Sequence, residues 1–288
     1  MSKKNVSDDE FYVIGQSERF TEARKKKLIK ILVNALAVLL CAAVFTLILQ
    51  YTVLRPKHSL KPLGSQDLSI CHPYTERIDT IINGLKLTLY IPHNAAAKLT
   101  IGCPDSSLIE NSVLAFRASD LGSNIENPQP EDFKIVGAFV YEGNLLQSEN
   151  EVAKPKPGFC AIIDGKVTVG ISESTPYFEE AVNKSGYFFR HFPVVDNGKA
   201  EDCHPNKNST TRRALCDRNG EIFVAVAETN PMNFANALSE LGVVNAISLL
   251  GYYKSFGGWW RDVDGNIEFF RKNDEYVVYE YENYIVWE

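Results

Sequence analysis

The sequence predicts an α+β protein with a single N-terminal transmembrane helix followed by one mixed, strand-rich domain. Three observations lead to this fold class. A long apolar stretch without charged residues lies near the N-terminus of the 288-residue chain. Farther along, Asn-Gly and Asp-Gly pairs separate apolar segments, which is typical of β-hairpins. Among these hairpins, one segment carries the start signal, the spacing and the stop signal of a helix.

The apolar stretch covers residues 31–54 and contains no charged side chain. A helix needs about 20 apolar residues to cross the hydrocarbon core of a bilayer, since each residue rises about 1.5 Å. We therefore predict a transmembrane helix over residues 31–54. A buried core helix and the apolar region of a cleaved signal peptide are the alternatives. Both are usually shorter, about 10–14 residues in the first case and about 7–15 in the second.

Basic residues gather on the N-terminal side of the apolar stretch. The flanking basic residues are Arg24, Lys25, Lys26, Lys27 and Lys30 before it, and Arg55, Lys57 and Lys61 after it. The positive-inside rule keeps the more basic flank in the cytoplasm. We therefore predict a single-pass signal-anchor protein, with a cytoplasmic tail over residues 1–30 and a C-terminal domain in the periplasm or outside the cell.

The remaining boundaries follow from composition. Residues 55–80 begin with a segment rich in proline and glycine, so we predict a linker there. Residues 81–288 are expected to form one extracytoplasmic domain.

The net charge is −6 and no basic stripe follows Lys61, which argues against a nucleic-acid partner because phosphate binding needs clustered Lys and Arg. The membrane is the expected partner of the N-terminal helix.

Strand signals dominate the outer domain. Apolar and polar residues alternate over residues 81–91, which predicts one half-buried strand. Three pairs that favour positive φ lie between apolar segments and predict hairpin turns: Asp164-Gly165, Asn219-Gly220 and Asp264-Gly265. Residues 275–288 are rich in aromatic and β-branched side chains and predict a strand pair or one long bent strand.

One helix has clear boundary signals. Asn230 is a favoured cap, and Pro231 fits the first helical position. Apolar residues follow at helical spacing over residues 232–241, and Gly242 is placed to end the helix. Residues 243–250 form an apolar segment that predicts a buried strand. A hairpin, a helix and a strand are thus expected to follow one another in this part of the chain.

Five cysteines follow the apolar stretch, and an exported domain permits disulfides between them. Cys203 and Cys216 can close a short loop, and Cys71 and Cys103 can form a second bridge. Cys160 lies in an apolar, strand-like segment and is expected to be buried. Because five is an odd number, at least one cysteine stays free or pairs with another chain.

The order of elements over residues 212–250 carries a family resemblance. An Arg-Arg-Ala segment beginning at Arg212 opens a strand, a turn and a second strand follow, and a helix leads to Gly242 and a short strand with an Asn-Ala pair. This order resembles the phosphodiester glycosidase family, which includes the uncovering enzyme that removes N-acetylglucosamine from a phosphodiester. The resemblance covers about residues 81–270 and rests on order and spacing. It implies a phosphodiester-glycosidase-like fold and a hydrolase acting on a sugar phosphodiester or a related glycan linkage.

The resemblance also implies where an active site lies. The family's Arg carries over as Arg212, which would clamp an anion. The family's Asn-Gly-Gly-Phe-Phe loop falls at residues 117–121, where Asp120 is the candidate acid or base. Its Asp-Gly-Gly-Gly-Ser loop falls at residues 250–255. The residues implied in binding a glycan or sugar phosphate are Arg117, Gly251, Tyr252, Tyr253 and Ser255.

Both loops depart from the family's pattern. Leu250 replaces the Asp, and Tyr252 and Tyr253 replace two glycines that let the backbone approach a phosphate or sugar. Arg212 can also be read as a surface residue that flanks a strand. An alternative function is therefore a catalytically inactive member of the fold that acts as a glycan- or protein-binding module at the membrane. A structural subunit of an envelope complex is a third class.

The sequence predicts no metal site and no cofactor. The histidines are scattered, and no two have the spacing of helical metal ligands: His58, His72, His93, His191 and His204. Residues 262–266 resemble part of a calcium loop but lack the distal Glu, so a hairpin turn is expected there. No Gly-x-Ser-x-Gly nucleophile elbow occurs.

Overall fold

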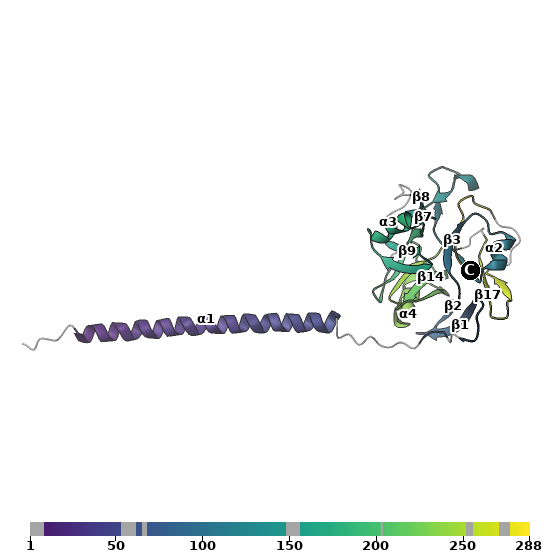
Figure 1. Cartoon of the computed structure of the whole chain (residues 1–288). Coiled ribbons are helices and arrows are strands. Elements are labelled where there is room, and N and C mark those ends of the chain that lie inside the picture. Colours follow the sequence, from purple (N-terminus) through teal and green to yellow (C-terminus); the bar gives the residue numbers. More distant parts are fainter. Residues whose placement is uncertain are drawn as a thin grey trace, which may run out of the picture. The chain divides into compact units, whose positions relative to one another are not determined.

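The computed structural model describes residues 9–52, 62–64, 68–147, 156–202, 204–251, 256–270 and 277–288 (Figure 1). The chain forms two units, Met1–Leu60 and Lys61–Glu288. The first contains helix α1 (Asp9–Thr52), and the second contains the remaining helices and all the described strands. The predicted fold class is confirmed: one apolar N-terminal helix precedes a mixed, strand-rich domain.

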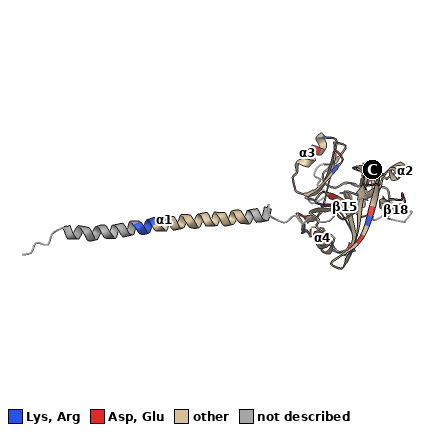
Figure 2. Ribbon diagram, turned by 60° about the horizontal axis from the view of Figure 1, so that its bottom comes forward, with Lys and Arg blue, Asp and Glu red and all other residues tan. Residues whose placement is uncertain are grey.

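Helix α1 begins at Asp9, well before the predicted start at residue 31, so part of the predicted tail is helical. Among the described residues, one helical stretch is long and apolar enough to cross a membrane, Arg24–Thr46. Figure 2 shows the basic residues at one end of this stretch and an uncharged run after them. Leu32 and Leu39 are among its exposed large apolar side chains. Water contact with such a surface is unfavourable, which fits a single-pass anchor.

The largest described sheet has seven strands, and neighbouring strands in it pair antiparallel. Its strands are, in spatial order, β1 (Tyr74–Ile82), β2 (Leu85–His93), β15 (Glu221–Thr229), β14 (Thr210–Arg218), β16 (Asn245–Ser248), β12 (Pro193–Asp196) and β13 (Lys199–Ala200). Helix α4 (Pro231–Glu240) covers part of it, with Phe234 and Leu238 buried against Phe223 and Ala225 of β15.

The described residues also form two five-stranded sheets and one short ribbon. The first five-stranded sheet contains β10 (Lys166–Ile171), β9 (Gly158–Ile163), β11 (Tyr187–His191), β7 (Phe139–Tyr141) and β8 (Asn144–Gln147). The second contains β18 (Ile267–Phe269), β17 (Trp259–Arg261), β4 (Leu114–Arg117), β19 (Asn283–Trp287) and β3 (Ala97–Ile101). The ribbon and the short helices are β5 (Leu121–Gly122), β6 (Lys134–Ile135), α2 (Ser106–Asn111), η1 (Pro130–Asp132) and α3 (Pro176–Asn183).

One apolar cluster joins the three larger sheets. Leu215 of β14, Phe189 of β11 and Ile285 of β19 are fully buried in it. Each comes from a different sheet. Their contact brings the ends of strands that are distant in sequence close together, and the candidate site lies at these ends.

The hairpin turns largely match the sequence signals. Asp164-Gly165 and Asn219-Gly220 connect paired strands with positive φ, as predicted. The single strand predicted over residues 81–91 is wrong, because Asn83 and Gly84 adopt φ of 50° and 78° and form a turn between β1 and β2. Strand β1 therefore begins at Tyr74, inside the segment predicted as a linker.

Helix α4 has the predicted boundaries. The side chain of Asn230 accepts a hydrogen bond from the Asn233 amide at 2.8 Å, Pro231 is the first helical residue, and Gly242 has a φ of 87°. The strand after it, β16, is shorter than predicted. The loop between β17 and β18 is a hairpin turn, as expected, and Asp262 Oδ1 accepts the Asn266 amide at 2.8 Å.

The C-terminal segment and the cysteines differ from expectation. The described part of residues 275–288 contains one strand, β19. Cys71 and Cys216 are free thiols, so neither predicted disulfide is confirmed. Cys216 lies on β14 and is fully buried in the cluster beneath α4. Cys160 is buried on β9, as predicted, and Cys203 lies outside the described residues.

Candidate functional site

A pocket of about 320 Å³ lies where β4, β11, β14 and β16 end or approach one another. Its polar lining includes Asp120, His191, Glu201, His204, Arg212, Arg213 and Ser248. The structure thus brings three residues singled out in the sequence, Asp120, Arg212 and Gly251, to one pocket. Tyr252, Tyr253 and Ser255 lie outside the described residues.

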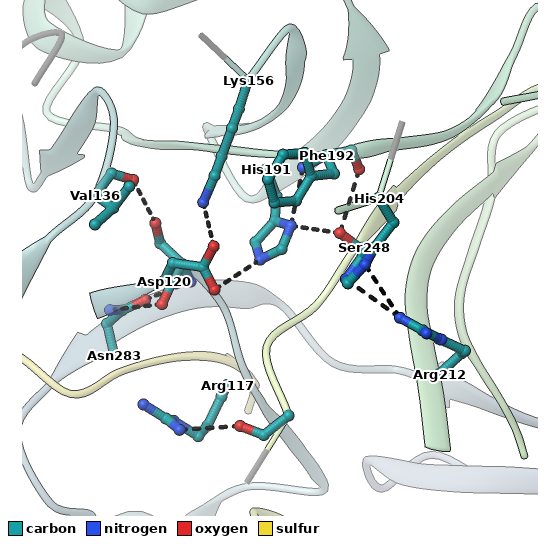
Figure 3. A network of polar contacts seen from close by, with 12 residues as sticks. Arg117, Asp120, Val136, Lys156, His191, Phe192, His204, Arg212, Ser248 and Asn283 are labelled. Atoms are coloured by element: carbon teal, nitrogen blue, oxygen red, sulfur yellow. Dashed lines mark hydrogen bonds and ion pairs between the residues drawn. The ribbon is translucent and has the colours of Figure 1, made fainter. Parts of the chain in front are cut away.

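The backbone around Asp120 is held on both sides (Figure 3). Asn283, fully buried on β19, accepts the Ser119 amide at 2.7 Å and donates to the Ser119 carbonyl at 3.3 Å. The carbonyl of Asp120 accepts the Val136 amide at 2.9 Å. These bonds replace strand pairing after β4 ends, and they fix the direction in which the Asp120 side chain leaves the chain.

Two basic side chains surround the Asp120 carboxylate. The Lys156 ammonium forms an ion pair with Oδ2, and His191 Nε2 lies 3.4 Å from Oδ1. Burial alone would raise the pKa of Asp120, but His191 and Lys156 together hold it well below its usual range. The carboxylate is therefore ionised at neutral pH. The sequence makes Asp120 a candidate acid or base. An ionised carboxylate has no proton to donate, so the role of general acid does not fit Asp120.

His191 ends β11 and is almost completely buried. Its Nδ1 accepts the Phe192 amide at 2.9 Å, so the ring proton belongs on Nε2, which faces Asp120. Burial lowers the pKa of His191, and the neighbouring Asp120 opposes this shift. The imidazole is therefore neutral at pH 7 and has its accepting nitrogen on the side away from Asp120.

The hydroxyl of Ser248 contacts that accepting nitrogen. Ser248 ends β16, and its Oγ is hydrogen-bonded to His191 Nδ1 and lies 3.3 Å from the Phe192 carbonyl oxygen. A hydroxyl, an imidazole and a carboxylate thus form a continuous chain, the Asp120–His191–Ser248 relay (Figure 3). A base that contacts a hydroxyl on one side and a carboxylate on the other is the arrangement that activates a nucleophile.

Arg212 lies across the pocket from the relay, on β14. Its Nη2 donates to the carbonyls of Asn206 at 2.8 Å and Asn208 at 2.5 Å, and its Nε donates to the Thr229 carbonyl at 3.3 Å. Its Nη1 lies 3.2 Å from His204 Nδ1. Most donors of Arg212 therefore bind backbone, which fixes the position of its charge at the pocket. Burial and then the charge of Arg212 lower the pKa of His204 to about 4.

Arg117 lies behind the pocket and is not among its lining residues. Its Nη1 donates to the Gly251 carbonyl at 2.9 Å, and its Nε lies 3.3 Å from Glu282, which is fully buried. Strand alternation on β4 directs Arg117 toward this buried carboxylate. Arg117 therefore positions the backbone at Gly251, and the role of substrate ligand does not fit its placement.

Sequence reasoning missed four residues of the site: Lys156, His191, His204 and Ser248. No local motif marks them, and the scattered spacing of the histidines predicts no metal site. In the structure His191 and Ser248 each end a strand, where side chains reach the rim of a sheet, but only Ser248 falls within a predicted strand, residues 243–250. Within the described residues, no group of three or more His, Cys, Asp or Glu side chains is arranged to hold a metal ion.

No protein-family model and no curated protein sequence matches the chain. Several solved structures are similar to it, and two of them illustrate the likeness. One is the catalytic domain of zebrafish N-acetylglucosamine-1-phosphodiester alpha-N-acetylglucosaminidase, auto-inhibited by its pro-peptide; the match covers 80% of this chain and 85% of that one, with 11% identity and a TM-score of 0.48. The other is a hypothetical protein from Synechocystis; the match covers 75% of this chain and 62% of that one, with 12% identity and a TM-score of 0.50.

At such low identities the likeness concerns the fold alone. It assigns neither an activity nor a set of catalytic residues to this chain, and the chemistry has to be argued from the pocket.

Proposed function

We propose that the outer domain is a membrane-anchored hydrolase of sugar-linked phosphodiesters and that the pocket is its active site. The observation that carries this proposal is the convergence of the Asp120–His191–Ser248 relay with Arg212 in one pocket. The order of sequence elements favours a sugar phosphodiester as the substrate class, because it resembles the phosphodiester glycosidase family.

His191 is suited to act as the general base. A base must be unprotonated at the working pH and must lie within hydrogen-bond reach of the proton that it takes. Burial keeps His191 neutral at pH 7, and its Nδ1 contacts a hydroxyl. Asp120 orients the ring through Nε2 and stabilises the imidazolium that forms when the proton is taken.

The arginines of the pocket suit an anionic substrate. Arg212 and Arg213 bring two guanidinium groups to the pocket, and both side chains are largely buried. In such a site the effective dielectric constant is lower than in water, so the attraction for a phosphodiester is stronger than at an exposed surface. The backbone carbonyls that hold Arg212 keep its charge in place before substrate arrives.

The anchor suggests where the substrate is found. The basic flank of Arg24–Thr46 supports a cytoplasmic N-terminus and, with it, an outer domain in the periplasm or outside the cell. Protease added to intact cells or spheroplasts tests this: the domain should be cut and the first thirty residues protected. Cleavage confined to the N-terminal segment would reverse the proposed orientation.

Turnover measurements test the hydrolase. Full-length protein in detergent micelles is assayed with bis(p-nitrophenyl) phosphate and with a sugar 1-phosphodiester. We expect His191→Gln to lower the turnover number by about a hundredfold or more, since general-base catalysis contributes about 10²–10⁴-fold. His93→Gln is the matched control, because His93 also pairs with a carboxylate, Glu76 at 2.9 Å, and does not line the pocket.

The outcomes separate the two function classes. Turnover that depends on His191 but not on His93 supports the hydrolase. Saturable binding of the sugar phosphodiester without any turnover would contradict it and would instead support the binding module.

A further inference from the structure

We propose that Ser248 is the nucleophile of this pocket and that the bond it breaks is a P–O bond of the phosphodiester, through a phosphoserine intermediate. This deepens the proposed function and rests on it. The alternative cleavage, at the C–O bond of the sugar, is the one expected of a glycosidase. The two cleavages release the same products, so the atoms that carry out the reaction must be identified separately.

The surroundings of Ser248 favour a nucleophile. Its Oγ contacts the nitrogen of His191 that carries no proton, and the other nitrogen of the ring lies 3.4 Å from the Asp120 carboxylate. The residue lines the pocket although it is only 6% exposed. A hydroxyl placed in this way can lose its proton directly to the imidazole as it attacks.

The charge balance around the relay supports the same assignment. Lys156 pairs with Asp120, and its ammonium also lies 4.8 Å from the centre of the Phe192 ring. Lys156 and Asp120 cancel each other, so the buried relay carries no net charge before reaction. The proton that moves from Ser248 to His191 therefore creates a cation next to a carboxylate that is already ionised.

The carboxylates of the pocket argue against cleavage of the C–O bond. Glycoside hydrolysis usually needs two carboxyl groups, one of them protonated so that it can act as the acid. Asp120 and Glu201 are the carboxylates among the described lining residues. Asp120 is ionised and committed to Lys156 and His191. An alcohol activated by histidine suits attack at phosphorus instead.

The reaction then has two balanced steps. Ser248 Oγ attacks phosphorus and gives its proton to His191; an Oγ–P bond forms, the P–O bond to the leaving alcohol breaks, and His191 returns the proton to that alcohol. A water molecule next gives a proton to His191 and attacks phosphorus. The Oγ–P bond breaks, Ser248 regains the proton, and a phosphate monoester leaves. Arg212 and Arg213 stabilise the additional charge on the phosphoryl oxygens in both steps.

A fluorophosphonate probe tests Ser248 as the nucleophile. With this probe, the Oγ–P bond forms, the P–F bond breaks, and the Ser248 proton leaves through His191 as hydrogen fluoride. Full-length protein in detergent is treated with the probe, and the adduct is located by peptide mass spectrometry. We expect one adduct at Ser248, its absence in Ser248→Ala and a labelling rate at least about a hundredfold lower in His191→Gln.

Two matched variants test whether replacing a buried serine or a carboxylate-paired histidine outside the pocket is enough to change the labelling rate. Ser112 is a fully buried serine whose hydroxyl accepts from Trp259 and donates to the Leu108 carbonyl, and it does not line the pocket. Ser112→Ala and His93→Gln should label at the wild-type rate. The proposal is overturned if the wild-type protein hydrolyses phosphodiesters but carries no adduct at Ser248, or if His191→Gln labels as fast as the wild type.

Oxygen-18 water identifies the bond without any variant. Hydrolysis of the sugar 1-phosphodiester in this water should place the label in the phosphate monoester and leave the released sugar unlabelled. Label in the sugar hydroxyl would show C–O cleavage and would overturn the proposal while leaving the proposed hydrolase intact. A complete lack of turnover with normal labelling of Ser248 would instead exclude the sugar phosphodiester as substrate. Failure of the P–O cleavage proposal and failure of the proposed function are therefore distinguishable.

Discussion

The hydroxyl of Ser248 contacts Nδ1 of His191 although the two residues end strands of different sheets. His191 ends β11 in a five-stranded sheet, and Ser248 ends β16 in the seven-stranded sheet. The Ser248 amide also donates to the Phe192 carbonyl at 2.9 Å. The relay is therefore assembled by the packing of two sheets, and changes in that packing should change its chemistry.

Gly158 tests this dependence on packing. A Cβ at Gly158 would lie 2.6 Å from the His191 carbonyl oxygen and 2.7 Å from the Ile247 side chain. Gly158→Ala should therefore separate β11 from β16, destabilise the domain by about 1–3 kcal/mol and lower turnover more than tenfold. Urea unfolding and turnover are measured on the same samples.

Gly170→Ala controls for overpacking in the same sheet. A Cβ there would meet the Phe159 ring at 2.6 Å, and Gly170 does not line the pocket. Gly170→Ala should lower the free energy of unfolding about as much as Gly158→Ala does, but it should leave turnover near the wild-type value. Equal losses of turnover in the two variants would contradict a specific effect of Gly158 on the relay.

Asp120 positions His191 and also pairs with Lys156. Its replacement should therefore affect both turnover and the free energy of unfolding, and a second change at Lys156 should separate the two effects. Asp120→Asn leaves the buried ammonium of Lys156 without its carboxylate, which should cost about 3 kcal/mol of unfolding free energy. Turnover should fall by about 10²–10⁴-fold, because an amide orients and stabilises His191 poorly. Adding Lys156→Met should restore stability but not turnover, as measured by urea unfolding and steady-state kinetics.

The pH profile of Asp120→Asn distinguishes positioning from a structural role. Asp120 opposes the lowering of the His191 pKa, so its removal should move the acid limb of the rate profile to lower pH. An acid limb that stays at the wild-type pH, together with a restored rate in the double variant, would show that Asp120 acts only on stability.

The guanidinium group of Arg212, held in place by its several N–H donors, should contribute to substrate binding. Arg212→Lys keeps the charge but cannot bind the carbonyls of Asn206, Asn208 and Thr229 together. We expect KM for the phosphodiester to rise at least about tenfold, corresponding to about 1.4 kcal/mol of lost binding. Steady-state kinetics over a range of substrate concentrations measures this rise.

Arg218 supplies the control on the same strand. It is as buried as Arg212 and binds the Leu241 carbonyl and Glu221. Arg218→Lys should reduce stability and leave KM unchanged. A KM that responds equally to both changes would argue against an anion site at Arg212.

Acid should destabilise the domain through His204. Its folded pKa is about 4, whereas an unfolded histidine titrates near about 6.5. The unfolded chain therefore binds the proton first as the pH falls, and the free energy of unfolding decreases between about pH 6.5 and about pH 4. The lowered pKa of the buried His191 acts in the same direction.

Urea unfolding across this range tests the prediction. His204→Gln removes the group that titrates, so its unfolding free energy should depend less steeply on pH than that of the wild type. Identical slopes for the two proteins would show that His204 does not contribute to acid destabilisation.

The parts of the fold that could be predicted are those specified by local sequence. Asn230, Pro231 and Gly242 delimit α4 because capping, proline placement and a positive φ act within one helical turn. The Asp-Gly and Asn-Gly turns are local in the same way. Asn83-Gly84 carries the same signal, but the apolar alternation on both sides of it masked the turn.

The site could be predicted only in part, because it is assembled from distant segments. Asp120 and Arg212 were found through the order of elements around them. His191, Ser248 and Lys156 have no motif, since their roles arise where three sheets share one core. The predicted bridge from Cys216 failed for a related reason: strand alternation directs this side chain into the core beneath α4.

A double-variant comparison tests most directly whether Ser248 and His191 act as one unit. Turnover of the sugar phosphodiester is measured for the wild type, Ser248→Ala, His191→Gln and the combined variant. Residues of one relay are strongly non-additive, so the combined variant should be no slower than the slower single variant. Losses that multiply, with the combined variant slower by the product of the two single effects, would contradict the relay.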